Sequence, residues 1–153
     1  MDADKRLQEL HLTLPPVGKP LAVYKPVVQV GNILYVSGHV PVLADSNTIK
    51  GKVGAELTLE QGQQAARQVG LTILATLKNS LGSLNKIKRL VKSLGMVNCT
   101  PTFYDIPKVI NGYSELMKEV FGDDAGVGAR SAVGMVSLPN NVAVEVEAIF
   151  EMV

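Results

Sequence analysis

The sequence has few of the features that define several common classes of protein. Its 153 residues include one cysteine, Cys99, and no tryptophan, and aromatic residues make up only 5%. A single thiol forms neither an internal disulfide nor a multi-cysteine metal site. Cys99 falls in an apolar segment, so we expect a small buried hydrophobic residue rather than a nucleophile. The lack of disulfides is typical of a reducing compartment.

The chain also lacks an excess of charge and a long apolar run. Its formal net charge is +1, which gives no general basic field to attract nucleic acid. No apolar run approaches the roughly 20 residues of a membrane-spanning helix. The charged start of the chain, residues 1–6, lacks the apolar centre of a signal peptide. We therefore expect a soluble, cytoplasmic protein with no membrane partner, and a nucleic-acid partner is disfavoured.

The sequence does contain enough aliphatic residues for one buried core, since 46% of its residues are hydrophobic. The periodicity of those residues predicts the order β-β-α-β-α-β-β. The expected strands cover residues 21–30, 33–38, 87–99, 129–139 and 142–152, and the expected helices cover residues 58–81 and 105–121. This order indicates an α+β fold with a mixed sheet and both helices on one face. Residues 1–19, with a short helix over 3–12, form an N-terminal extension to a domain at 20–153.

Local signals mark the ends of these elements. Thr58 and Gln61 fit a capping box at the start of the first long helix, and Gly82 is a typical C-terminal stop. Asp105 is a candidate N-cap for the second long helix. The pair Gly31-Asn32 predicts a tight hairpin between the first two strands.

The last strand predicts a sheet face that a single chain cannot cover. Its apolar positions, which are Val142, Val144, Val146, Ala148, Phe150 and Met152, alternate with a second set that contains three glutamates. In the preceding strand both faces are apolar. Because no third layer of structure remains in the chain, we expect copies of the chain to associate through this second face.

Arg130 is the one charged residue at the start of an apolar strand, and a buried guanidinium needs an anionic partner. An ion pair with Glu145, Glu147 or Glu151 would satisfy it. If residues 129–139 and 142–152 form a hairpin, Arg130 and Glu145 lie about 15 Å apart along the strands. An intrachain pair with Glu145 then requires a large bulge, whereas Glu147 and Glu151 stay open as partners.

Several segments together resemble the RidA/YjgF family of enamine/imine deaminase-like proteins, which are also labelled endoribonuclease L-PSP-like. They are Tyr24, Gly31-Asn32, residues 35–38, Asn111, Ala129-Arg130-Ser131, Leu138-Pro139 and residues 144–148. The resemblance spans about residues 20–152. It implies a chorismate-mutase-like fold and a homotrimer with clefts between its subunits, which agrees with the uncovered sheet face.

The resemblance also implies a reaction and a set of site residues. Arg130 would bind the carboxylate of a small 2-imino acid, a role that suits the planar guanidinium fork. Glu145 would orient or activate the water that attacks the imine carbon, giving a 2-oxo acid and ammonium without a metal or cofactor. The other residues implied at the cleft are Tyr24, Ser37, Gly38, His39 and Asn111.

The sequence departs from the family pattern at several positions, including Gly112-Tyr113 beside Asn111 and the extension at residues 1–19. Ala132 stands where many members have cysteine, which excludes a thiol mechanism at that position. Gly128 replaces the usual proline, and His39 stands where glutamine is common. A histidine there either titrates near neutral pH or is a hydrogen-bonded wall residue, and we favour the second.

Two other functions are compatible with these residues. The first is a trimer that binds small carboxylates or a protein partner without turnover. The second is a ribonuclease, which the near-neutral charge and the lack of a basic, aromatic surface disfavour.

Overall fold

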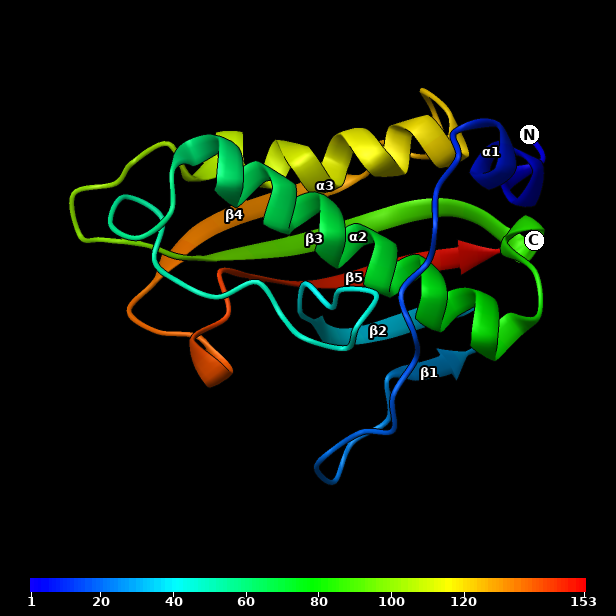
Figure 1. Cartoon of the computed structure of the whole chain (residues 1–153). Coiled ribbons are helices and arrows are strands. Elements are labelled where there is room, and N and C mark those ends of the chain that lie inside the picture. The colour runs from blue at the N-terminus through cyan, green and yellow to red at the C-terminus, as the bar shows by residue number, and fades with distance from the viewer.

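The computed structural model describes all residues from 1 to 153. Its helices are α1 (Ala3–Glu9), α2 (Leu59–Leu81) and α3 (Ile106–Phe121), with short 3₁₀ turns η1 (Leu84–Lys86) and η2 (Pro139–Asn141). Its strands are β1 (Val27–Val30), β2 (Ile33–His39), β3 (Ile87–Asn98), β4 (Ala129–Met135) and β5 (Val144–Met152). After α1, the order is the predicted β-β-α-β-α-β-β (Figure 1).

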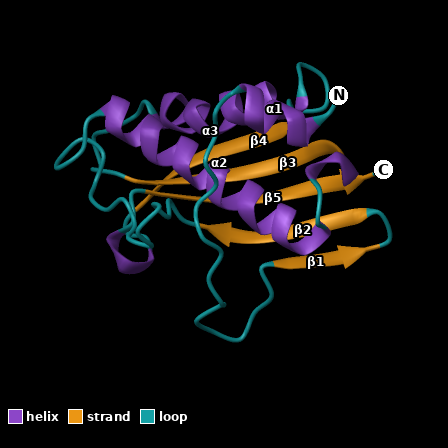
Figure 2. Cartoon of the chain, turned by 45° about the vertical axis from the view of Figure 1, so that its right-hand side comes forward, coloured by secondary structure: helices purple, strands orange, loops and turns teal.

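The strands form one mixed sheet in the order β1-β2-β5-β3-β4. The pair β3–β4 is parallel and all other neighbouring pairs are antiparallel. Helices α2 and α3 lie side by side over one face of this sheet, as two views of the chain show (Figures 1 and 2). The prediction of an α+β fold with both long helices on one face is therefore confirmed.

The predicted hairpin between the last two strands is wrong. β5 lies between β2 and β3, whereas β4 pairs only with β3 at the edge of the sheet. Ser93 of β3 has Arg130 opposite it on one side and Ala148 opposite it on the other. The turn signal at residues 139–141 is real, because Asn140 and Asn141 adopt left-handed φ values of 54° and 57°. That turn, however, carries the chain past the end of β3 instead of joining neighbouring strands.

The buried side chain of Asn98 holds this crossing in place. Its amide nitrogen donates to Asn141 Oδ1 at 3.0 Å and to the Val142 carbonyl at 3.2 Å. Its oxygen accepts from Lys52 Nζ at 2.7 Å, and the same ammonium donates to the Val136 carbonyl. One side chain at the end of β3 therefore fixes the loop before α2 and the connection from β4 to β5.

Most of the predicted element ends are confirmed. Thr58 and Gln61 form both hydrogen bonds of the capping box, and Gly82 ends α2 with φ of 83°. The first strand begins only at Val27, after Pro26, because proline lacks the N–H that a ladder needs. Asp105 occupies the N-cap position of α3 without a capping hydrogen bond; its carboxylate instead lies 3.4 Å from Lys108 Nζ.

The core lies between the helix layer and the sheet. On β5, the predicted apolar set is buried beneath the helices at Val144, Val146, Ala148 and Phe150, and Met152 at the strand end is partly buried. The alternate positions, Glu145, Glu147, Ile149 and Glu151, point to the opposite face, which no helix of the chain covers (Figure 2). The predicted uncovered face is therefore present.

The N-terminal segment packs on the same core. Ala3 and Leu7 of α1 are buried, and Asp4 accepts a hydrogen bond from Ser83 and pairs with Lys78 at 3.2 Å. From α1 the chain passes over the helix layer to β1 (Figure 1). The boundary at residue 19 stays a prediction. None of the helices combines the length and apolarity that crossing a bilayer requires.

The Asn98 network leads to a stability prediction. Asn98→Ala should lower the free energy of unfolding by about 2 kcal/mol or more, because it leaves buried polar partners without hydrogen bonds. Urea denaturation measures this change. Asn79→Ala, at an exposed site on α2, is the control and should change stability by less than about 0.5 kcal/mol. Equal effects of the two substitutions would contradict the role given to Asn98.

Candidate functional site

The predicted site residues fall into two groups, and the first surrounds Arg130. This residue begins the edge strand β4 and reaches toward α3, where its Nη1 donates to Asn111 Oδ1 at 2.8 Å and to Ser114 Oγ at 3.2 Å. Asn111 and Ser114 lie three residues apart and therefore share one face of the helix. Ser114 was missed in the sequence; its spacing from Asn111 was the signal that could have identified it.

Arg130 is exposed in the single chain, which contradicts the expectation of a buried guanidinium, and it has no carboxylate partner there. It forms none of the ion pairs in the structure, and Glu151 pairs instead with Lys88 at 2.9 Å. The structural ion pair that the sequence left open is therefore absent. Only Nη1 is engaged, so Nη2 and Nε are available for the two parallel hydrogen bonds that a carboxylate accepts.

A small hollow of about 160 Å³ adjoins this guanidinium. Its lining residues are Leu90, Ser93, Ser114, Gly126, Val127, Gly128, Ala129 and Arg130. A Cβ at Gly128 would lie 2.8 Å from the Val91 carbonyl oxygen. Glycine at this position thus lets the chain entering β4 lie close against β3.

The second group surrounds Glu145 on the uncovered face of the sheet. This side chain is half-buried against Gly38, where an added Cβ would overlap Glu145 Oε1. Burial raises the pKa of the Glu145 carboxyl above its ordinary value, and the negative charge of Glu147 raises it further. A carboxyl whose pKa is raised toward neutrality suits proton transfer in either direction.

Ser37 joins Tyr24 to this second group. The Ser37 hydroxyl donates to the Lys25 carbonyl at 2.6 Å, and the Ser37 N–H donates to the Pro26 carbonyl at 2.9 Å. These two bonds tie the segment that follows Tyr24 to β2. The tyrosine side chain itself is 52% exposed, so it is accessible at the edge of the group.

His39 faces α2 instead of the uncovered face. Its Nδ1 lies 2.6 Å from the Ser37 carbonyl oxygen and its Nε2 lies 2.9 Å from Thr76 Oγ1. Burial lowers the pKa of the imidazole, so the ring is neutral at pH 7. Both nitrogens are used within the chain, which agrees with a hydrogen-bonded wall residue and leaves neither free for direct contact with a ligand.

The sheet register separates the two groups. Arg130 lies opposite Ser93, whereas Glu145 lies opposite Met96 on the other side of β3. Two strand spacings and three residues along the strands put the two backbones about 14 Å apart. The sequence predicted a similar separation between Arg130 and Glu145, of about 15 Å, although it was derived from a hairpin that does not form. One chain therefore does not bring Arg130 and Glu145 together.

The uncovered face carries a concavity of about 350 Å³. Its lining residues are Val28, Tyr35, Val36, Ser37, Lys92, Leu94, Glu147, Ala148 and Ile149. The surface is mostly apolar, with Lys92 and Glu147 as its two charged groups. It adjoins the Glu145 group through Ser37 and Glu147.

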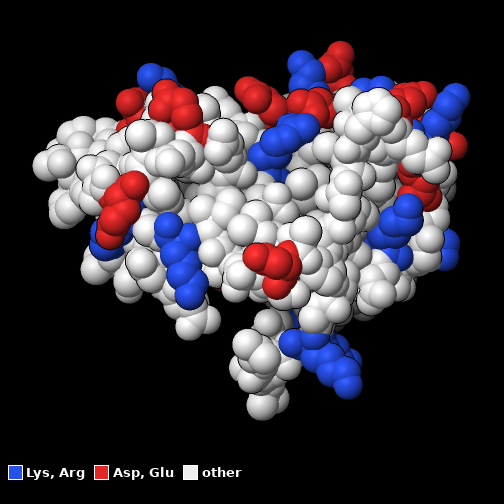
Figure 3. All heavy atoms as spheres, viewed as in Figure 1, with Lys and Arg blue, Asp and Glu red and all other residues white.

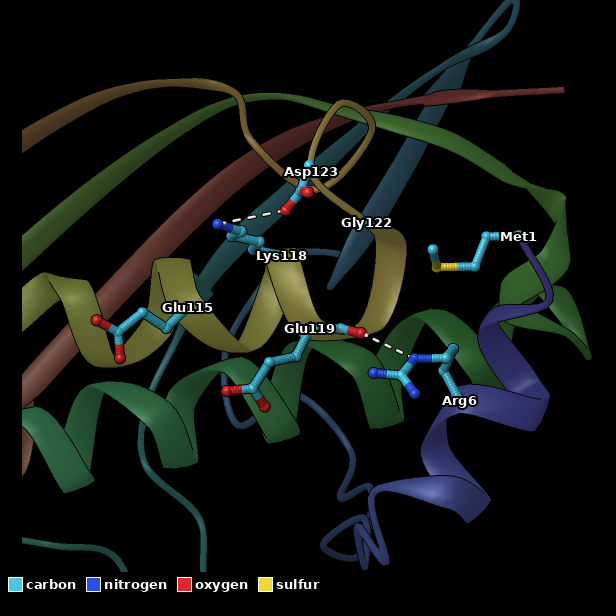
Figure 4. A pocket seen from close by; sticks show the side chains of 7 residues that line it. All are labelled: Met1, Arg6, Glu115, Lys118, Glu119, Gly122 and Asp123. Carbon is cyan, nitrogen blue, oxygen red and sulfur yellow. Dashed lines mark hydrogen bonds and ion pairs between the residues drawn. The ribbon is translucent and has the colours of Figure 1, made fainter.

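The largest hollow, of about 610 Å³, lies elsewhere, between α1 and the end of α3 (Figure 4). Lys118 pairs there with Asp123 at 3.3 Å, and Arg6 Nε donates to the Glu119 carbonyl at 3.2 Å. Met1 is its one apolar lining residue. Because its basic groups are already partnered and none of the predicted residues lines it, this hollow is not the candidate site.

Two further predictions concern Cys99 and metals. Cys99 is buried, and burial raises the pKa of its thiol, so the prediction of a small hydrophobic residue is confirmed. The structure contains no cluster of three or more His, Cys, Asp or Glu side chains that could hold a metal ion.

Comparison with known proteins identifies the family. The family model described as "YjgF/chorismate_mutase-like, putative endoribonuclease" matches residues 4–151. The chain belongs to the RidA/YjgF family. It is 40% identical to Protein TCP17 of Trypanosoma cruzi over 146 residues, which cover 95% of this chain and 91% of that protein.

Two further proteins resemble the chain over most of its length. The crystal structure of Atu1372 from Agrobacterium tumefaciens is 41% identical, with a TM-score of 0.89 over 99% of this chain and 94% of that chain. A protein of Dermatophagoides farinae named 2-iminobutanoate/2-iminopropanoate deaminase is 27% identical over 139 residues, which cover 90% of this chain and 92% of that protein. Both alignments span most of the RidA/YjgF domain.

The burial of Glu145 predicts a pH-dependent effect on stability. The folded state holds this proton more tightly than the unfolded chain, so ionised Glu145 destabilises the fold. The cost is absent below the ordinary pKa of 4.5 and grows as pH rises from there through the raised pKa. Glu145→Gln should therefore raise the melting temperature at pH 7.5, with a difference that vanishes near pH 4.

Thermal unfolding at fixed protein concentration measures this effect. Glu115→Gln, at an exposed site on α3, is the control and should follow the parent protein at every pH. A melting-temperature difference between Glu145→Gln and the parent that does not change with pH would show that the carboxyl is not destabilised by burial.

Proposed function

We propose that the protein hydrolyses small 2-imino acids, or their enamine tautomers, to 2-oxo acids and ammonium in a cleft between two copies of the chain. The observation that carries this proposal is the Arg130 guanidinium, which is held by α3 through Nη1 and has no anion in its own chain. A relative at 27% identity is named 2-iminobutanoate/2-iminopropanoate deaminase, which supports the same reaction class.

A cyclic homotrimer would complete the site. The sheet has two different edges, with Arg130 on β4 at one edge and β1, next to the Ser37–Gly38 segment of β2, at the other. Head-to-tail contacts between unlike edges form a ring when the rotation from one copy to the next closes after three copies. Exposed apolar side chains lie near both edges, at Val28 and Val30 on β1 and at Val133 and Val136 at the end of β4. Edge contacts alone would leave β1 and β2 of the next copy between its Glu145 and Arg130, so the uncovered faces would have to pack around the ring axis for Arg130 of one copy to approach Glu145 of the next.

The proposed chemistry needs one anchor and one proton carrier. The Nη2 and Nε of Arg130 would bind the substrate carboxylate in a bidentate way. Ionised Glu145 would accept a proton as water attacks the carbon of the protonated imine, forming a carbinolamine. Return of that proton to the nitrogen allows the C–N bond to break; as it breaks, ionised Glu145 would accept the hydroxyl proton of the carbinolamine and pass it to the departing ammonia, which leaves the 2-oxo acid and ammonium. Because the substrate is already reactive, positioning supplies much of the acceleration.

A coupled assay tests the activity. An amino acid oxidase generates the imine, and the rate of 2-oxo acid release is compared with and without the protein. Arg130→Ala should lower kcat/KM by about 100-fold, because two charge-assisted hydrogen bonds to the substrate are lost. Arg89→Ala, which removes a surface arginine paired with Asp124, is the matched control and should retain full activity.

A parent protein that does not accelerate 2-oxo acid release would contradict the proposal. In that case the Arg130 group supports the non-catalytic alternative, a protein that binds small carboxylates. A 2-oxo acid should then raise the melting temperature of the parent and not that of Arg130→Ala.

The charge on the face that carries the helices does not favour a ribonuclease. Lys and Arg side chains are interspersed with Asp and Glu over the face that carries the helices (Figure 3). Sequence-independent binding of RNA instead relies on a continuous basic groove with stacked aromatic side chains.

A further inference from the structure

The pairing of β2 with β5 is interrupted opposite Glu147, two residues from Glu145. Val36 lies opposite Ala148 and His39 lies opposite Val146, so two residues of β2, Ser37 and Gly38, face a single residue of β5. This is the arrangement of a β-bulge, which bends a strand and redirects its backbone. The bulge brings Gly38 against the Glu145 carboxylate.

Every polar group of the first bulge residue is engaged. The N–H and hydroxyl of Ser37 donate to the carbonyls of Pro26 and Lys25. Its carbonyl oxygen lies 2.6 Å from His39 Nδ1. Because a carbonyl only accepts, Nδ1 must carry the proton and donate it.

The tautomer of His39 then determines the direction of its hydrogen bond with Thr76. In a neutral ring whose proton is on Nδ1, Nε2 is an acceptor, so the Thr76 hydroxyl at 2.9 Å donates to it. Thr76 is buried on α2, and His39 is only 8% exposed. The ring is therefore a rigid link from the helix layer to the bulge.

We propose that His39 is a positioning residue for imine hydrolysis: the Thr76–His39–Ser37 link fixes the bulge so that Gly38 holds Glu145 in its half-buried, reactive position. This inference rests on the proposed function. It gives His39 a role through Ser37 and Gly38 and not through contact with substrate. A purely structural role would instead make His39 a satisfied core residue whose loss affects stability alone.

The sequence offers a matched pair of substitutions on α2. Thr76→Val removes the hydroxyl that holds His39, at nearly constant volume. Thr72→Val removes an equivalent buried hydroxyl one turn earlier, which bonds to Gln68 and Val42 instead. His39→Leu removes both contacts of the ring, and His39→Asn restores a side-chain N–H near the position of Nδ1.

In the coupled assay, His39→Leu and Thr76→Val should both lower kcat, because a small displacement of a reacting group slows the reaction. For His39→Leu the decrease should be about tenfold or more. KM should stay within about twofold, since the Arg130 group is untouched. His39→Asn should recover most of the loss, and Thr72→Val should keep the parental kcat. If Thr76→Val and Thr72→Val reduce stability alike and both leave kcat unchanged, the positioning role is wrong.

A second readout does not depend on turnover. The pKa of Glu145, followed through its carboxyl carbon by NMR, should fall toward its ordinary value in His39→Leu and Thr76→Val and stay raised in Thr72→Val, because a relaxed bulge admits water to the carboxyl. Glu147, which adjoins Glu145 in the same chain, and Arg130, which would approach it from a neighbouring copy, are unchanged in all of these variants. If the parent protein proves inactive, the proposed function fails, but this pKa measurement still decides whether the Thr76–His39–Ser37 link positions Glu145. An unaltered Glu145 pKa in both His39→Leu and Thr76→Val overturns the inference.

Discussion

The central position of β5 is the constraint on which the rest of the structure depends. The strand pairs with β2 on one side and β3 on the other. Alternate β5 side chains therefore point to opposite faces at the middle of the sheet. One set of side chains is buried beneath α2 and α3, and the other set, with Glu145 and Glu147, is directed to a face that the chain leaves uncovered. A shift of register by one residue would bury these glutamates in the core and expose the apolar set.

The central position of β5 also separates the two groups of candidate site residues. Insertion of β5 between β2 and β3 places the Glu145 group two strands away from the edge strand that carries Arg130. Asn98 maintains this division, because it binds the segment through which the chain passes from β4 to β5. Arg130 is exposed and has no anion in its own chain, and in the proposed cleft a neighbouring copy would bring it to the half-buried Glu145.

The sequence predicted what depends on local physics. The capping box at Thr58, the stop at Gly82 and the alternation in the last strand follow from interactions between residues close in the chain, and each is confirmed. Strand order depends on contacts between distant segments, so the turn at Asn140 was interpreted as a hairpin between β4 and β5, which it connects but which do not pair. The link from His39 to Thr76 joins residues 37 positions apart, and no local pattern marks it. The resemblance to the RidA/YjgF family supplied the candidate residues, whereas the structure showed which of them one chain brings together.

Complementation between two inactive variants tests the shared cleft most directly. Arg130→Ala and Glu145→Gln are each expected to be inactive, and the two are mixed in equal amounts under conditions that exchange subunits. If Arg130 of one copy and Glu145 of another form each site, random mixing should restore about one quarter of the parental activity, since about a quarter of the interfaces contain both intact residues. If a single chain forms the whole site, no chain in the mixture has both residues, and the mixture will be as inactive as its components while the parent protein turns over. That result would contradict the account.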